Sequence, residues 1–111
     1  MAKTFFIVNP IAGGGKAGGL VPIIRQAMAE VEIQYDLAIT RGPGDAVDIA
    51  KRGLGAGYEV LVAVGGDGTI NEVARGILEA DRGRLGILPS GTGNDLARSL
   101  GIVFDPIKAM D

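Results

Sequence analysis

Four short apolar runs alternate with stretches of helical periodicity along the chain. The runs span residues 4–8, 33–39, 60–64 and 85–88. The third run, Val60–Val64, is apolar at every position, which is typical of a central parallel strand covered on both faces. Strands that alternate with helices predict an α/β fold, with a mostly parallel sheet between two layers of helices in a three-layer sandwich.

Each apolar run is followed by a segment with the features of a helix. The first helix is expected to open at Gly18 or Gly19, with Pro22 in its first turn, where a missing N–H costs little. Its predicted buried face is formed by Leu20, Ile24, Ala27 and Val31. The second helix begins at Gly44–Asp45, with Asp45 as its expected N-cap. The last two helices are expected at residues 70–78 and 94–100.

Composition narrows the chemistry that the chain can perform. It is 47% hydrophobic and 22% charged, with a net charge of −2, which is typical of a folded globular domain. No basic stripe and few aromatic residues (5%) are present, so nucleic acid is not an expected partner. Without Cys or His, disulfides, cysteine-ligated zinc and histidine-based catalysis are excluded. The N-terminal apolar run is too short for a signal peptide or membrane span, so we expect a cytoplasmic protein.

The 19 glycines are concentrated in three turns, each between a predicted strand and a helix. These turns are Gly13–Gly15, Gly65–Thr69 and Gly91–Gly93. In a parallel sheet they emerge together at the carboxyl edge, where open α/β folds bind ligands. Glycine lets the backbone approach a ligand closely, and the following helix offers free N–H groups and a positive dipole end. Three such turns at one edge predict a phosphate cradle rather than three ordinary tight turns.

The common phosphate-binding patterns fit the first glycine turn poorly. Gly13–Gly18 matches the dinucleotide pattern G-x-G-x-x-G, with Glu32 and Asp36 near the position of its ribose-binding acid. A glycine run this dense meets that pattern easily. The P-loop pattern fails, because Ala17 follows the Gly-Lys pair and Pro10 stands where its first glycine belongs.

Asp67, inside the second glycine turn, is the most informative residue. A carboxylate within a phosphate cradle repels the ligand unless a cation lies between them, and one or two carboxylates with phosphate oxygens are the usual protein ligands of Mg²⁺. Asp67 is therefore the candidate metal ligand, directly or through water, and the candidate catalytic residue of this chain. Its alternative role is to stabilise its own turn, and Thr69 is either an N-cap or a ligand contact. Lys16 is either a phosphate contact or a solvated surface lysine.

Four motifs together make the chain resemble the bacterial diacylglycerol/lipid kinase family. These are Asn9–Gly14, Thr40 with Gly44–Ala46, Gly65–Val73 and Pro89–Arg98. The Gly-Gly-Asp-Gly-Thr core within the third is shared with NAD kinases and is similar in phosphofructokinases. The Asn-Glu-Val extension and the Gly-Thr-Gly-Asn-Asp block favour a lipid kinase. The resemblance covers essentially the whole chain and implies a Rossmann/phosphofructokinase-like sheet.

By this resemblance the domain binds ATP with Mg²⁺, and the full-length protein transfers the γ-phosphoryl group to a diacylglycerol-like lipid hydroxyl. The implied nucleotide contacts are Asn9, Pro10, Ile11, Ala12, Gly13, Thr40, Gly66, Asp67, Gly68, Thr69, Ile70, Asn71, Glu72 and Thr92. Asn94 and Asp95 would shape the far wall of the cleft or cap the last helix. Two alternatives stay open: an NAD kinase-like or other small-molecule kinase with the same cradle, and a non-catalytic Rossmann-type module that binds NAD(P).

Members of this family carry a second, β-rich domain that supplies the general base, with the lipid in the cleft between the two domains. The chain stops at Pro106–Asp111 without such a domain, so we expect residues 1–111 to be the nucleotide-binding domain of a longer protein. Alone, it is expected to bind nucleotide weakly and to lack kinase activity. Uncovered apolar surface would favour a homo-oligomer. Peripheral membrane contact stays open, since this half has no amphipathic basic helix.

Overall fold

The computed structural model describes residues 3–90 of the 111-residue chain. The described elements, in chain order, are β1 (Thr4–Val8), α1 (Lys16–Gly19), α2 (Val21–Val31), β2 (Tyr35–Ile39), α3 (Asp45–Gly55), β3 (Val60–Gly65), α4 (Asp67–Ala80) and β4 (Arg84–Pro89). The predicted turn at Gly91–Gly93 and helix at 94–100 lie outside the described residues, as do Thr92, Asn94 and Asp95.

The four strands form one parallel sheet in the order β2-β1-β3-β4. Every residue of β3 is buried, as the unbroken apolar run predicts for a central strand. Strand β2 is at one edge of this sheet, and none of its five residues is fully buried, because only one neighbouring strand pairs with it. The predicted α/β fold with a parallel sheet is confirmed.

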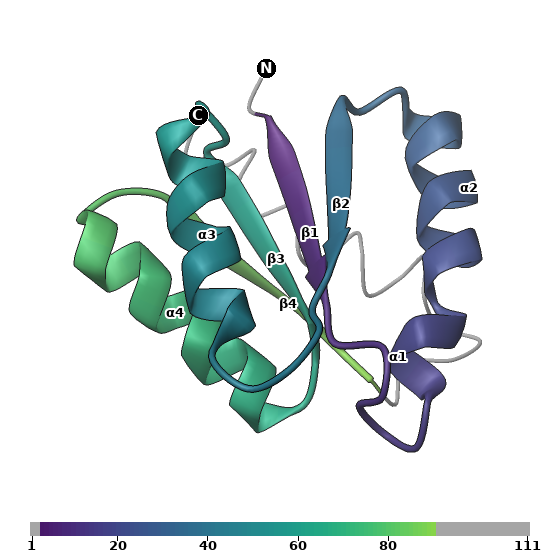
Figure 1. Ribbon diagram of the computed structural model, residues 1–111. Helices are drawn as coiled ribbons and strands as arrows, with labels where there is room; N and C mark the ends of the chain where they lie inside the picture. Colours follow the sequence, from purple (N-terminus) through teal and green to yellow (C-terminus); the bar gives the residue numbers. More distant parts are fainter. Residues whose placement is uncertain (1–2, 91–111) are drawn as a thin grey trace.

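Helices cover both faces of the sheet, so the molecule has three layers. Figure 1 shows α1 and α2 on one face and α3 and α4 on the other. Two separate hydrophobic clusters fill the two interfaces, one joining α2 to Phe6 and Val62, the other joining α3 and α4 to Ile7 and Leu61. Alternate residues of β1 and β3 enter opposite clusters, since successive side chains of a strand point to opposite faces.

Several element boundaries differ from those predicted. The first helix does not open at Gly18 or Gly19: α1 ends at Gly19, and α2 begins at Val21. Helix α4 begins at Asp67 rather than Ile70, because Gly66 is still extended and Asp67 already has helical geometry. Strand β2 begins at Tyr35 rather than Ile33. The N–H of Ile33 bonds to the carbonyl of Met28 at 3.3 Å, so Ile33 belongs to the turn that closes α2.

Three single-residue predictions are wrong. Asp45 is not an N-cap: Gly44 occupies that position with φ 85°, and an Asp45 carboxylate oxygen instead accepts a hydrogen bond from the N–H of Arg41 at 2.9 Å. Thr69 is not an N-cap either, because it lies inside α4. Val31 is 55% exposed, since α2 ends there and the next residue adopts a left-handed conformation.

Helices α3 and α4 are packed at unusually short range. A Cβ on Gly76 of α4 would lie 2.6 Å from the Cβ of Ala50 and 3.0 Å from the carbonyl oxygen of Val47, both on α3. Only glycine therefore permits this approach. Salt bridges from Glu79 to Lys51 (3.2 Å) and to Arg75 (2.9 Å) lie along the same helix pair.

Candidate functional site

The carboxyl ends of the strands carry the loops that bind ligands in folds of this kind. In the order β2-β1-β3-β4, β2 lies on one side of β1, whereas β3 and β4 lie on the other, so the strand order reverses between β1 and β3. The loop after β1 leads to α1 on one face, and the turn after β3 leads to α4 on the other. Loops that diverge in this way leave a crevice at the switch point of the sheet.

A pocket of about 270 Å³ lies at this edge. Its walls are the loop after β1, the loop after β2 with the start of α3, and the first turns of α4. The lining residues are Asn9, Pro10, Ile11, Thr40, Arg41, Gly42, Pro43, Ala46, Gly68, Thr69 and Glu72. Three segments far apart in sequence therefore meet at one site.

Seven of the residues that the sequence motifs assign to the nucleotide line this pocket: Asn9, Pro10, Ile11, Thr40, Gly68, Thr69 and Glu72. Other assigned residues have different positions. Ala12 and Ile70 pack against the two hydrophobic clusters, and Asn71 is exposed on α4. Gly13, Gly66 and Asp67 are in the adjoining turns rather than in the pocket lining.

The first glycine turn has the backbone geometry that requires glycine. Gly13, Gly14 and Gly15 all have positive φ (65°, 69° and 98°). A Cβ on Gly13 would lie 2.8 Å from Oγ of Ser90, whereas one on Gly14 would meet nothing within 4 Å. The turn is thus held against the end of β4 at Gly13 and open at Gly14. Lys16 is exposed at the start of α1.

The N-terminus of α4 supplies uncapped backbone donors at the pocket. No side chain caps this helix, and the first N–H groups of a helix have no intrahelical partner. Thr69 is buried (5% exposed) against Gly65, where a Cβ would come within 2.6 Å of its Oγ1. The strand-to-helix turn is therefore compact, with N–H groups and a positive dipole end free for an anion.

Asp67 is the first residue of α4, and its carboxylate is exposed beside this terminus. Residues 3–90 contain no cluster of three or more Asp, Glu, His or Cys side chains that could enclose a metal ion. Mg²⁺ does not need one, because it retains water and takes much of its coordination from phosphate oxygens. A lone accessible carboxylate next to a phosphate cradle fits that requirement.

Glu72 has a protein partner inside the pocket. Its Oε1 accepts a hydrogen bond from the N–H of Ala46 at 3.2 Å, so a side chain of α4 caps the start of α3. Sequence motifs identified neither this bond nor the three lining residues Arg41, Gly42 and Pro43. A cation directly after a strand, at the carboxyl edge, is the signal that marks Arg41.

Glu32 and Asp36, the acids of the dinucleotide pattern, lie near the opposite end of the sheet. Glu32 precedes β2, and Asp36 is the second residue of that strand. The carboxylate of Asp36 accepts a hydrogen bond from the Tyr58 hydroxyl, and this bond, with partial desolvation and the nearby negative charge, raises the pKa of Tyr58. Neither acid can reach a ribose at the carboxyl edge, which counts against the Rossmann-type NAD(P) fingerprint here.

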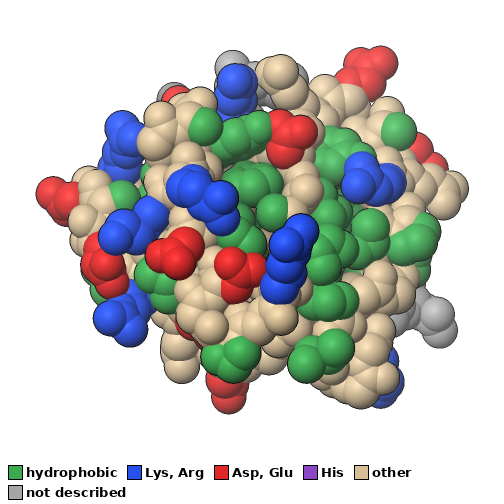
Figure 2. Space-filling model, in the orientation of Figure 1, with side chains coloured by type: hydrophobic (Ala, Val, Ile, Leu, Met, Phe, Trp, Pro, Cys, Tyr) green, Lys and Arg blue, Asp and Glu red, His purple; other side chains and the backbone are tan. Residues whose placement is uncertain are grey.

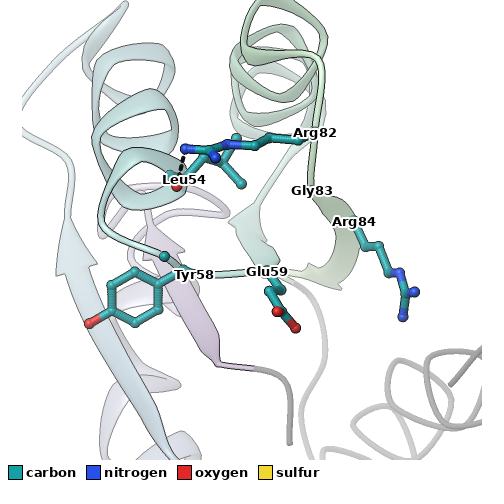
Figure 3. A pocket seen from close by; sticks show the side chains of 7 residues that line it. Leu54, Tyr58, Glu59, Arg82, Gly83 and Arg84 are labelled. Atoms are coloured by element: carbon teal, nitrogen blue, oxygen red, sulfur yellow. Dashed lines mark hydrogen bonds between the residues drawn. The ribbon is translucent and has the colours of Figure 1, made fainter.

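A second, wider pocket of about 490 Å³ lies at the amino edge (Figure 3). Its polar side chains do not converge. Arg82 points to α3, where its guanidinium donates to the carbonyl oxygen of Leu54 at 2.6 Å, while Arg84 points away from it. Its backbone groups are partly used as well, since the N–H of Arg84 bonds to the carbonyl of Glu59. The carboxyl-edge pocket is therefore the candidate site.

Charged side chains of both signs lie on the face of the molecule seen in Figure 2. In Figure 2, Lys and Arg side chains are interleaved with Asp and Glu on the face that carries α3 and α4. That face does not present a basic stripe of the kind that binds nucleic acid. Within residues 3–90 there is no helix with the length and apolar character needed to cross a membrane.

The fold and pocket define an α/β domain with an uncapped helix N-terminus at the carboxyl edge of its sheet, and comparison with known proteins identifies its family. The family model "Diacylglycerol kinase catalytic domain" matches residues 3–111, so the chain belongs to this family. It is 38% identical over 106 residues to a diacylglycerol kinase of Staphylococcus carnosus and 49% identical over 106 residues to one of Staphylococcus aureus (strain JH9). Both alignments cover 95% of this chain but only 35% and 34% of the relatives. The chain thus spans about a third of their length.

Solved structures agree with this assignment. A crystal structure of a diacylglycerol kinase from Bacillus anthracis str. Sterne superposes with a TM-score of 0.63 at 31% identity, covering 90% of this chain and 37% of that one. The solution structure of a phosphate-loop protein superposes with a TM-score of 0.67 at 20% identity, covering 98% and 94%. This second likeness concerns the fold alone.

Proposed function

We propose that the chain is the nucleotide-binding domain of a lipid kinase that uses ATP and Mg²⁺ to phosphorylate a diacylglycerol-like hydroxyl. The observation that carries the proposal is the pocket where the uncapped start of α4 meets the loops after β1 and β2. Membership of the diacylglycerol kinase catalytic domain family and relatives named diacylglycerol kinase support the acceptor class.

Phosphoryl transfer requires positioning and charge neutralisation more than covalent chemistry from the protein. The N–H groups at the start of α4 would bind phosphate oxygens, with Gly68 and Thr69 in the pocket lining. The glycine turn at Gly13–Gly15 would bound the other side of the phosphates. In the transfer, the bond from the γ-phosphorus to the bridging oxygen breaks as the acceptor oxygen bonds to phosphorus.

Asp67 would hold Mg²⁺, directly or through water, and the metal would offset the charge of the triphosphate. Thr40 and Arg41 line the wall opposite α4 and would contact the nucleotide there. We expect the general base that takes the proton of the acceptor hydroxyl to come from outside residues 1–111. The described residues of this proposal share the carboxyl edge of the sheet, and Thr92 lies outside the part of the chain that the structure describes.

Metal-dependent binding tests the proposal. We expect Asp67→Asn to weaken binding of Mg·ATP about tenfold, equivalent to about 1.4 kcal/mol. Metal-free ATP should bind the variant at least as tightly as wild type, because the substitution removes a negative charge that repels the triphosphate. Asp48→Asn is the matched control, since Asp48 is an exposed acid in the first turn of α3. Equal affinity of wild type and Asp67→Asn for Mg·ATP would contradict the metal role.

The acceptor is tested with the full-length protein. Phosphorylation of diacylglycerol in mixed micelles, but not of NAD, is the expected result. Preference for NAD would support the NAD kinase-like alternative instead. Tight binding of NAD(P) without Mg²⁺, and no transfer to either acceptor, would support the non-catalytic module.

A further inference from the structure

The start of α3 forms part of the pocket wall and is not capped by its own segment. Gly44, at the N-cap position, has no side chain to offer, and the Asp45 carboxylate is turned back to the N–H of Arg41. The acceptor for the N–H of Ala46 comes from Glu72, a residue 26 positions further along the chain. The first N–H groups of a helix need an outside acceptor, so this contact satisfies one of them.

The Glu72–Ala46 bond joins two walls of the same pocket. Glu72 belongs to the wall formed by α4, and Ala46 to the wall that begins with Thr40 and Arg41. The bond is part-buried, and Thr40, which lines the pocket, is only 8% exposed. One turn beyond Glu72, Gly76 brings the two helices into close contact. The bond therefore lies at the pocket end of a tightly packed pair of helices.

A second argument concerns charge. An acidic side chain free to face a triphosphate would repel it, as the case of Asp67 illustrates, unless a cation or a donor occupies its oxygens. One oxygen of Glu72 is already used by an N–H at the positive end of the α3 dipole. This partner favours a role in holding the pocket together over one in binding the ligand.

We propose that Glu72 is a positioning residue, whose carboxylate fixes the start of α3 and thereby the places of Thr40 and Arg41 at the nucleotide. This inference rests on the proposed nucleotide-binding function. It assigns to Glu72 an action through the protein backbone, in contrast to the direct nucleotide contact that the sequence motifs assign to it.

The test compares Glu72→Gln with Glu72→Ala in the 111-residue chain. The amide oxygen of Gln can still accept from Ala46, whereas Ala cannot. We expect Glu72→Gln to bind Mg·ATP within about twofold of wild type, and Glu72→Ala to bind roughly tenfold more weakly, as for loss of a charge-assisted hydrogen bond. Glu79→Ala is the matched control, because Glu79 also links α4 to α3, through Lys51, but away from the pocket.

Hydrogen exchange of the Ala46 amide, followed by NMR without nucleotide, gives an independent readout. Faster exchange in Glu72→Ala than in Glu72→Gln or Glu79→Ala supports the positioning bond, and unchanged exchange overturns it. Loss of Mg·ATP binding in Glu72→Gln while the Ala46 amide stays protected also overturns it, since the charge would then act on the ligand or its metal. If wild type fails to bind Mg·ATP, the proposed function fails, and the exchange arm still decides whether the bond exists.

Discussion

The carboxylate of Glu72 accepts a hydrogen bond from the N–H of Ala46 at 3.2 Å, so α4 caps the N-terminus of α3. The other end of α3 receives the opposite charge, because the Arg82 guanidinium, just past α4, donates to the carbonyl oxygen of Leu54 at 2.6 Å. An acid at the N-terminus and a base at the C-terminus both complement the helix dipole. Both ends of α3 thus bond to α4 or to the residues just after it, and α4 also forms part of the carboxyl-edge pocket.

The contact between α3 and α4 predicts opposite effects for two glycine substitutions. Gly76→Ala should destabilise the domain by about 1–3 kcal/mol, because its Cβ would overlap Ala50. Gly55→Ala, in α3 with nothing within 4 Å, should stabilise it by about 0.5–1 kcal/mol. Urea unfolding of both variants measures the difference. Equal stability of the two variants would contradict the close packing.

Gly13→Ala and Gly14→Ala separate backbone strain from a steric clash in the first glycine turn. Both residues have positive φ, so both substitutions strain the backbone, but only at Gly13 does a Cβ meet Ser90. We expect Gly13→Ala to weaken Mg·ATP binding by a further factor of about ten relative to Gly14→Ala, corresponding to about 1.4 kcal/mol. Isothermal titration of the two variants gives the ratio. Equal Mg·ATP affinity of the two variants would show that a clash with Ser90 does not affect nucleotide binding.

The Tyr58–Asp36 pair predicts a stability change at alkaline pH. Because its hydroxyl donates to the Asp36 carboxylate, Tyr58 has a folded-state pKa above the tyrosine value of about 10. Stability from this bond is therefore fully present below the unfolded pKa and lost as pH rises through the folded pKa. The chain has two tyrosines, so in a Tyr35→Phe background Tyr58 is the only source of phenolate absorbance. Its phenolate absorbance should appear at lower pH once Asp36→Ala is added, and an unmoved titration would exclude the bond.

The 111-residue chain alone is expected to lack kinase activity. The described residues offer candidate phosphate contacts and one candidate metal ligand, Asp67, and we expect the general base to come from elsewhere. The chain should therefore bind Mg·ATP weakly and transfer no phosphate to diacylglycerol in a radiometric assay. Robust transfer by the isolated chain would place the base within residues 1–111.

The parts of the fold that the sequence predicted are those that local patterns encode. The unbroken apolar run of β3 predicted a central strand, and the glycine turns predicted a candidate site at the carboxyl edge, where the structure has a pocket. The Glu72–Ala46 bond could not be predicted, because it joins residues distant in sequence. Helical periodicity assigned Val31 to the buried face, but the helix ends there and leaves that side chain exposed.

The fit at Gly76 also limits how the site can respond to its ligand. The close contact of Gly76 with Val47 and Ala50 opposes sliding of α4 against α3, so we expect the two helices to move as one unit. The loop after β1, which contains three glycines of positive φ, forms another wall of the pocket. If the pocket closes around a bound nucleotide, we expect residues 9–15 to move toward α3 and α4, with the two helices keeping their positions.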